Sequence, residues 1–226
     1  MVREQYLEVE ERVKQACLRA GRKREDVTLV AVSKTKPLPM LLDAYEAGAR
    51  DFGENKVQEI LEKSPGMPGD ARFHMIGHLQ RNKVRQVIGK TVLIHSVDSL
   101  RLARQIEEES ARAGLVTPVL LEINVAREES KFGFFVEEVE KALEEIALFS
   151  HMRVKGFMTI PPFVENPEQN RKVFQDLFQL SVDIASKNID NMSMDVLSMG
   201  MSGDYEVAIE EGATIVRVGT SIFGHR

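Results

Sequence analysis

The stretch that decides the fold is residues 27–37, which read Val27-Thr28-Leu29-Val30-Ala31-Val32-Ser33-Lys34-Thr35-Lys36-Pro37. Its first half is an apolar run rich in β-branched residues, which is typical of a strand buried in a parallel sheet. Pro37 has no amide hydrogen, so an interior strand cannot continue through it. An ammonium group at the end of a buried strand costs free energy unless it is paired, deprotonated or used covalently. Lys34 is therefore a candidate for Schiff-base chemistry, and the alternative is a lysine that extends from the rim of the sheet into solvent.

Seven further strand patterns follow this one, and a helical pattern separates each from the next. They cover residues 50–52, 73–76, 91–95, 118–124, 154–160, 194–199 and 214–218. Strict alternation predicts parallel βα units with right-handed crossovers, and eight such units in 226 residues predict a (β/α)8 TIM-type barrel. The alternative is a doubly wound open sheet. Such a sheet usually opens with a glycine-rich turn, which the segment after Val32 lacks.

The helical patterns include one in front of the first strand. Together they cover residues 6–20, 38–47, 57–62, 80–88, 98–114, 136–149, 167–186 and 204–210. Asp98 has the side chain of a good N-cap, so we expect it to cap the helix that it begins.

The composition, with 43% hydrophobic and 29% charged residues, fits one sizeable globular core. We therefore expect a single domain over residues 1–226. The net charge of -5 and the pI of about 5.7 give no reason to expect nucleic acid or an anionic membrane as a partner. Cys17 is the only cysteine, so no internal disulfide can form and we expect a reducing, cytoplasmic setting. The N-terminus lacks the apolar core of a signal peptide, and no apolar run approaches the roughly 18 residues of a membrane span.

Functional residues of such a barrel gather at the C-terminal ends of the strands. Two loops there are informative together, because residues 198–203 (SMGMSG) follow the seventh strand and residues 219–221 (GTS) follow the eighth. Barrels often hold phosphate with this pair of loops, where glycine amides and hydroxyl groups donate to the anion. Asp204 counts against a phosphate site unless its carboxylate points away. Each loop taken alone reads as an ordinary helix cap.

A lysine that faces a phosphate-binding pair of loops indicates a ligand with both an aldehyde and a phosphate. Pyridoxal 5'-phosphate (PLP) has both groups. Arg217, two residues before Gly219, is placed to face the ring nitrogen of such a ligand. A guanidinium there discourages protonation of the nitrogen, so the ring would be a poor electron sink. The alternative is a rim arginine paired with a carboxylate. The histidines are scattered along the sequence and predict no metal site.

Five segments carry a resemblance to a known family. They are residues 31–37 (AVSKTKP), 52–55 (FGEN), 76–83 (IGHLQRNK), 197–202 (LSMGMS) and 216–224 (VRVGTSIFG). Together they resemble the pyridoxal phosphate homeostasis protein family, whose members are single-domain barrels similar to the N-terminal domain of bacterial alanine racemase. The match runs in register from before Lys34 to the C-terminus.

The resemblance implies a set of cofactor-binding residues, which are Lys34, Asn55, His78, Ser202, Arg217, Gly219 and Thr220. Lys34 would hold PLP as an internal aldimine, and Arg217 would face the pyridine nitrogen. The two loops would hold the phosphate, and Asn55 and His78 match family motifs near the cofactor. Lys36 has the same strand parity as Lys34, so alternation alone does not choose between them. The family motif favours Lys34, with Lys36 as a secondary acceptor of the cofactor.

The resemblance also implies a role in vitamin B6 homeostasis. In this role the protein would be a monomer that holds PLP without efficient turnover and passes it to PLP-requiring apo-enzymes. Racemases of the related barrel type use a tyrosine from a second domain as the base on the opposite face. The tyrosines of this sequence, Tyr6, Tyr45 and Tyr205, occupy no matching position. A weak PLP-dependent amino-acid racemase and a phosphosugar barrel enzyme with an aldolase-type lysine are the alternatives.

Overall fold

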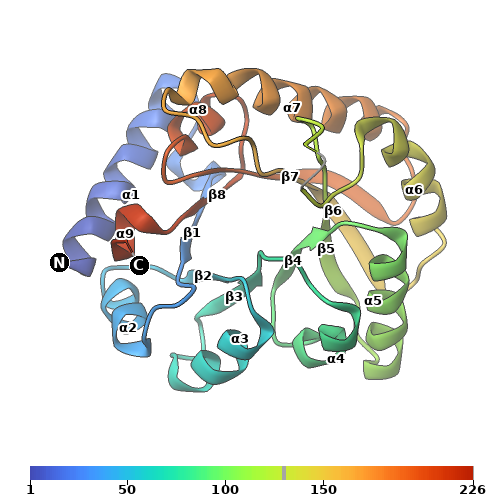
Figure 1. Ribbon diagram of the computed structural model, residues 1–226, viewed down its shortest axis with the longest axis horizontal. Helices are drawn as coiled ribbons and strands as arrows, with labels where there is room; N and C mark the ends of the chain where they lie inside the picture. Colours follow the sequence, from blue (N-terminus) through green and yellow to red (C-terminus); the bar gives the residue numbers. More distant parts are fainter. Residues whose placement is uncertain (129–130, 226) are drawn as a thin grey trace.

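Eight parallel strands close into a barrel in chain order, and β8 pairs back with β1 (Figure 1). The computed structural model describes residues 1–128 and 131–225. The strands are β1 (Thr28–Val32), β2 (Asp51–Glu54), β3 (Arg72–Met75), β4 (Leu93–Val97), β5 (Thr117–Glu122), β6 (Met152–Met158), β7 (Met192–Met201) and β8 (Ile215–Val218). The closed barrel confirms the predicted (β/α)8 fold and excludes the open sheet, because an open sheet leaves two edge strands unpaired.

Helices surround the barrel on the outside (Figure 1). They are α1 (Val2–Arg19), α2 (Leu38–Glu46), α3 (Val57–Lys63), α4 (Val84–Val87), α5 (Leu100–Ala113), α6 (Val139–Ile146), α7 (Arg171–Ser186), α8 (Tyr205–Glu210) and α9 (Thr220–Phe223). The helix expected over residues 80–88 is shorter than predicted, because a 3-10 turn (η3, Arg81–Lys83) leads into the single turn of α4 and only Val84 and Val87 are buried there. No helix in the described ranges has both the length and the apolar character to cross a membrane.

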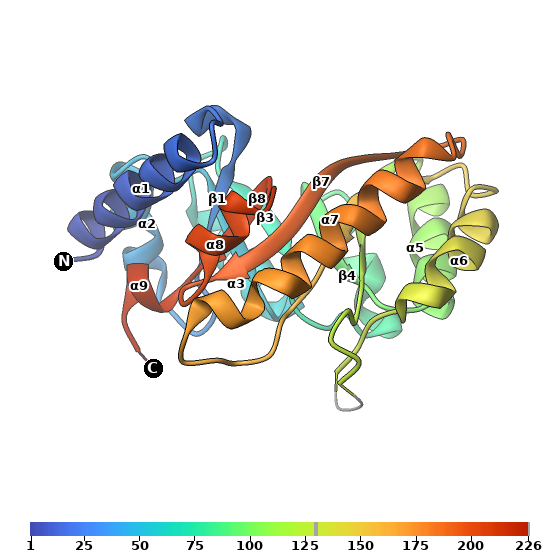
Figure 2. The ribbon, with the colours of Figure 1, turned by 90° about the horizontal axis from the view of Figure 1, so that it is seen from above.

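The helix α1 precedes the barrel and packs beside α2, α8 and α9 (Figure 2). Its buried side chains recur at helical spacing and are Val2, Tyr6, Val9, Val13, Ala16 and Cys17. Arg12 and Arg19 add ion pairs to Glu206 of α8, with N–O distances of 2.6 and 2.8 Å. The predicted N-terminal helix is thus confirmed, and it covers the side of the barrel where the last strand meets the first.

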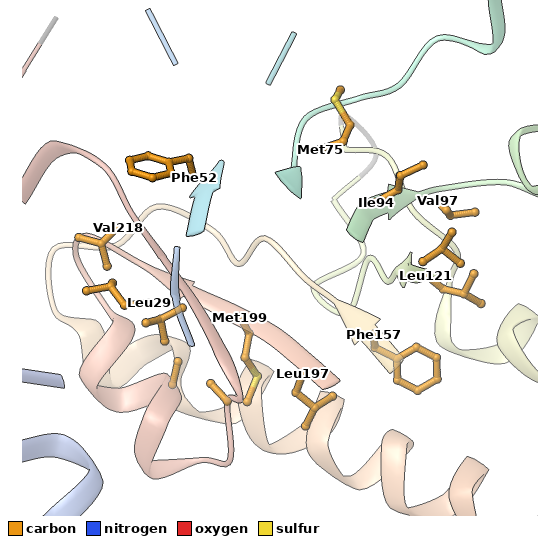
Figure 3. Packing of buried hydrophobic residues seen from close by; sticks show 14 of the residues in the cluster. Leu29, Phe52, Met75, Ile94, Val97, Leu121, Phe157, Leu197, Met199 and Val218 are labelled. Carbon is orange, nitrogen blue, oxygen red and sulfur yellow. The ribbon is translucent and has the colours of Figure 1, made fainter. Parts of the chain in front are cut away.

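Strand alternation sorts the side chains of β1 between two sides of the sheet. Leu29 and Ala31 belong to the large apolar cluster between strands and helices, and Figure 3 shows Leu29 within that cluster. Val30 belongs to a smaller cluster inside the barrel. Val32 and Lys34 have the parity of Val30, and both line a cavity at the C-terminal mouth of the barrel. The alternation along β1 therefore carries Lys34 to the inside of the mouth.

The strand β7 is longer than predicted, because residues 192–193 and 200–201 also belong to it. Its register with β8 shifts by one residue between Ser198 and Met201, which is the mark of a β-bulge. Gly200 lies in this bulge with φ at +90°, and a Cβ there would lie 2.6 Å from the Cβ of Ala208. Glycine thus allows both the bulge and the close packing of α8 against it.

Candidate functional site

A cavity of about 900 Å³ opens at the C-terminal ends of the strands, within the size range of small-molecule sites. Its lining includes every residue that the sequence predicted for the site, namely Lys34, Asn55, His78, Ser202, Arg217, Gly219 and Thr220. These residues come from segments at both ends of the chain, so closure of the barrel brings them together. Within the described ranges, no three His, Cys, Asp or Glu residues are grouped as metal ligands.

Lys34 stands in the turn after β1, and local hydrogen bonds hold this turn in one conformation. Thr35 has a φ of 64°, a left-handed conformation that costs a residue with a side chain about 1–3 kcal/mol. The amide of Thr35 donates to Glu59 Oε1 at 2.6 Å, and the amide of Lys36 donates to Ser33 O at 3.0 Å. These bonds offset the strain, so the backbone that carries Lys34 is fixed before any ligand arrives.

A second lysine, Lys63 of α3, ties this turn to β2. Its ammonium donates to Ser33 O at 2.8 Å, to Glu54 Oε1 at 2.8 Å and to Glu59 Oε1 at 2.9 Å. Burial raises the pKa of Glu54, and the hydrogen bonds from Lys63 and Ser33 oppose that rise. The other carboxylate oxygen of Glu54 has no hydrogen-bond partner among the described residues. Glu54 therefore depends on Lys63 for its compensation, and the pair locks β2 to the turn after β1.

The ammonium of Lys36 is directed at the end of the described chain. It donates to Gly224 O at 3.0 Å and to His225 O at 2.9 Å. These bonds hold the segment after α9 against the turn after β1. Strand parity left Lys34 and Lys36 as alternatives, and in this geometry Lys36 has a structural role.

Arg217 lies at the base of the cavity and is 4% exposed. Its Nη1 donates to Ser198 Oγ at 2.6 Å, and its Nη2 donates to Thr159 O at 2.9 Å. Burial lowers the pKa of Arg217 to about 10, while the negative charges of Glu122 and Asp204 oppose that fall. The guanidinium therefore keeps its charge at neutral pH. The alternative of a carboxylate-paired rim arginine is wrong, because the side chain is buried and its hydrogen-bond acceptors among the described residues are Ser198 Oγ and Thr159 O, not a carboxylate.

The loops after β7 and β8 are joined by one hydrogen bond, because Ser202 Oγ accepts from the amide of Gly219 at 3.1 Å. Asp204 does not face the loops as a free carboxylate. Its Oδ1 accepts from the amide of Met201 at 2.7 Å, and its Oδ2 accepts from Asn170 Nδ2 at 2.8 Å. Asp204 is 7% exposed. Its carboxylate thus shapes the loop after β7 and has one neutral donor on each oxygen, but Asp204 also lines the cavity, so its negative charge stays near the proposed phosphate site.

Asn55 follows β2 and is placed by a close backbone contact with the loop after β3. A Cβ at Gly77 would lie 2.6 Å from Asn55 O and 2.7 Å from Asn55 Cα. Only glycine at position 77 allows the two loops to approach this closely. The motifs FGEN and IGHL therefore meet at the mouth.

His78 lies at the rim, and an aspartate and an aromatic ring orient it. Its Nδ1 lies 2.9 Å from Asp98 Oδ2, and its ring stacks on Phe132 with 4.0 Å between centroids. The prediction that Asp98 caps α5 is wrong, because Ser99 is the N-cap and accepts from the amide of Leu102. The Asp98 carboxylate instead forms a hydrogen bond with His78.

Glu122 is a residue of the cavity that the sequence reasoning missed. It ends β5, lines the cavity and is 7% exposed. Burial raises its pKa to about 7, Asp98 adds to this rise and Arg217 opposes it. The sequence extended β5 to Asn124, whose side chain instead bonds the backbone of Glu128. The inward parity of Glu122 with Leu120 is the signal that would have found it.

The comparisons with known proteins cover nearly the whole chain. A family model described as the alanine racemase N-terminal domain matches residues 9–226. The pyridoxal phosphate homeostasis protein of Aquifex aeolicus (strain VF5) is 43% identical over 99% of this chain and 97% of its own length. The structure of PipY from Synechococcus elongatus PCC7942 with PLP bound has a TM-score of 0.83 at 30% identity, covering 99% of this chain and 100% of PipY.

A more distant structure shows the shared fold alone. Alanine racemase of Clostridium difficile 630 has a TM-score of 0.77 at 14% identity, and the match covers 99% of this chain and 57% of that enzyme. The family resemblance seen in the five sequence motifs is confirmed by the nearer relatives. The chain belongs to the pyridoxal phosphate homeostasis protein family, whose barrel is that of the alanine racemase N-terminal domain.

Proposed function

We propose that this protein binds PLP at the C-terminal mouth of its barrel and serves vitamin B6 homeostasis. The observation that carries the proposal is the meeting of Lys34, Arg217 and the loop residues Ser202, Gly219 and Thr220 in one cavity. Two comparisons support it, since PipY was solved with PLP bound and the Aquifex relative is a pyridoxal phosphate homeostasis protein.

The residues of the cavity fit three parts of PLP, which are its aldehyde, its phosphate and its ring nitrogen. When bound, PLP supplies an aldehyde and an electron-withdrawing ring. The amine of Lys34 would take the aldehyde covalently, and the Ser202 hydroxyl with the loop at Gly219 and Thr220 would hold the phosphate. Arg217 would donate to the ring nitrogen, because a guanidinium has only N–H donors and no acceptor.

The same residues favour holding PLP over turning a substrate over. Arg217, charged at neutral pH, would keep the ring nitrogen unprotonated and so would weaken the ring as an electron sink. Racemisation needs positioned groups on both faces of the substrate. None of the tyrosines lines the cavity, since Tyr6 and Tyr205 are buried in the outer core and Tyr45 donates to Asp70. We therefore propose a carrier that passes PLP to apo-enzymes.

Reduction with borohydride followed by peptide mapping tests the proposal. Wild type incubated with PLP should carry a pyridoxyl group on Lys34, and so should Lys36→Ala, its matched control. Lys34→Ala should lose the adduct. An adduct on Lys36 alone, or none in wild type, would overturn the site. Steady conversion of one amino-acid enantiomer into the other by wild type, abolished in Lys34→Ala, would overturn the carrier role.

A further inference from the structure

A chain of hydrogen-bonded side chains runs inside the barrel from Arg217. Arg217 Nη1 donates to Ser198 Oγ at 2.6 Å, and Ser198 Oγ lies 2.8 Å from His95 Nδ1. His95 Nε2 lies 2.9 Å from His74 Nδ1, and His74 Nε2 lies 2.9 Å from Asp51 Oδ1. Each ring nitrogen of both histidines therefore has a partner within the chain.

The two ends of the chain lie at opposite ends of the barrel. Arg217 lines the cavity at the C-terminal mouth. Asp51 and His74 line a second cavity, of about 490 Å³, together with Thr28 and Ile215. Thr28, Asp51 and Ile215 are the first residues of their strands, so this second cavity is at the N-terminal end of the barrel. The polar chain connects the mouth with the far end.

The burial of the chain is nearly complete. His95 and Ser198 are 0% exposed, His74 and Arg217 are 4% exposed and Asp51 is 7% exposed. Branched aliphatic side chains commonly fill barrels of this type, and they need no hydrogen-bond partner. A polar chain in the same space is costly unless every member is satisfied. Every member here has a partner, and the chain of bonds ends on Arg217, which lines the cavity.

The chemistry of its ends gives the chain a direction. Arg217 can only donate, whereas Asp51 accepts from His74 and from Arg72. Burial lowers the pKa of His95 well below 6.5, and the positive charge of Arg217 lowers it further, so His95 is neutral. If His74 carries a single ring proton, one arrangement satisfies every link. His74 donates to Asp51, His95 donates to His74 through Nε2, and Ser198 donates to His95 Nδ1.

This arrangement leaves the Ser198 oxygen as the acceptor for Arg217. Protonation of His74 would reverse both hydrogen bonds of His95. His74 Nδ1 would donate to His95 Nε2, and His95 Nδ1 would donate to Ser198. The hydroxyl proton of Ser198 would then have to point away from both His95 and Arg217. Asp51, by accepting from His74 Nε2, selects the tautomer of His74 that keeps the order.

We propose that Ser198, His95, His74 and Asp51 are positioning residues for Arg217, which fix the orientation of its guanidinium and so the hydrogen bond that it offers to the ring nitrogen of PLP. The inference rests on the proposed function. Other charged groups near Arg217 are Glu122 from β5 and Asp204 after β7, and both act on it through their charge and not through the chain.

Nitrogen-15 NMR of the histidine rings tests the chain without any cofactor. In the protein alone, His95 should show a protonated Nε2 and an unprotonated Nδ1. In Asp51→Asn an amide can donate to His74 Nε2, so the His95 tautomer should change or become mixed. A protonated Nδ1 on His95 of wild type would overturn the proposal.

The visible absorption band of bound PLP tests the effect on the site. As the pH rises, bound PLP would lose a proton, and a guanidinium held beside the ring nitrogen would favour that loss. Ser198→Ala and Asp51→Asn should therefore both raise the pH midpoint of the band, by about 0.5–1 pH unit, the size of one hydrogen bond. Loss of the Asp51 negative charge by itself would lower this midpoint. The direction of the shift in Asp51→Asn therefore separates an effect on the orientation of Arg217 from an effect of the lost charge alone.

Glu109→Gln is the matched control, because Glu109 is a comparably buried carboxylate, 9% exposed, on α5. It should leave the midpoint unchanged even where it lowers the melting temperature. If Ser198→Ala and Asp51→Asn both fold and both keep the wild-type pH midpoint of the band, the proposal is overturned. If wild type formed no adduct on Lys34, the proposed function would fail, and the NMR of the protein alone would still decide whether the chain is ordered as described.

Discussion

The hydroxyl oxygen of Ser202 accepts a hydrogen bond from the amide of Gly219 at 3.1 Å, and this bond joins the loop after β7 to the loop after β8. The two loops thus form one unit at the mouth of the barrel. A phosphate that binds there would meet the hydroxyl and the neighbouring amides already held in place, so little ordering is needed on binding.

Ser202→Ala should weaken the retention of PLP. The hydroxyl would be lost both as a donor to the phosphate and as the acceptor of the Gly219 amide. We expect a loss of about 0.5–3 kcal/mol in binding free energy, the range for a hydrogen bond to a charged group with partial compensation. Equilibrium dialysis measures it. Ser186→Ala, at the end of α7, is the control and should retain PLP like wild type. Equal retention by both variants would remove Ser202 from the site.

Lys36→Ala should loosen the C-terminal segment without abolishing PLP binding. The ammonium of Lys36 holds the carbonyls of Gly224 and His225, and the variant leaves both without this donor. We expect faster amide exchange in α9 and a loss of about 1 kcal/mol in the free energy of unfolding. Hydrogen–deuterium exchange with mass spectrometry reads the first effect. The same exchange rates in Lys36→Ala and in the exposed-site control Lys90→Ala would contradict this role.

Gly200→Ala should destabilise the barrel strongly. The new Cβ would lie 2.6 Å from the Cβ of Ala208 and 2.9 Å from Tyr205 Cα, at a φ of +90° that disfavours a side chain. We expect a loss of about 2 kcal/mol or more, from overpacking and from backbone strain together. Gly69→Ala is the control, because a Cβ there has no heavy atom within 4 Å. Urea unfolding of the two variants should differ clearly, and similar curves would show that the bulge tolerates a side chain.

Glu122→Gln should change how stability depends on pH. Folding raises the pKa of Glu122 from 4.5 to about 7, so the folded protein binds this proton more tightly than the unfolded chain does. The stabilisation is full below pH 4.5 and is lost as the pH rises through about 7. Over that window wild type should lose up to roughly 3 kcal/mol that the glutamine variant keeps. Urea unfolding at several pH values measures the difference. The exposed-site variant Glu62→Gln should follow wild type, and parallel curves for all three proteins would show that Glu122 does not titrate in this way.

The order of strands and helices could be predicted from the sequence because it depends on patterns between near neighbours. An apolar run such as residues 28–32 needs two covered faces, and eight strand patterns separated by amphipathic segments fit a closed parallel barrel. Alternation along β1 also set the side to which Lys34 points. The family motifs then identified residues that the structure places around one cavity.

Local sequence patterns could not predict the bulge at Gly200 or the hydrogen-bond partner of Asp98. A glycine in a loop-like run reads the same whether it ends a strand or bulges within one, and the packing of Ala208 decides between them. Asp98 reads as a cap because its neighbours form a helix. Its carboxylate turns to His78, which lies 20 positions earlier in the chain.

What the sequence determined by itself was therefore the barrel, the parity that carries Lys34 to its mouth, and the segments that supply the site. Only the tertiary structure decided which side chains meet inside the barrel. His95 and Ser198 are 103 positions apart, yet their side chains share a hydrogen bond in the core. No local rule pairs them, because closure of β8 onto β1 and the register of every strand between set that distance.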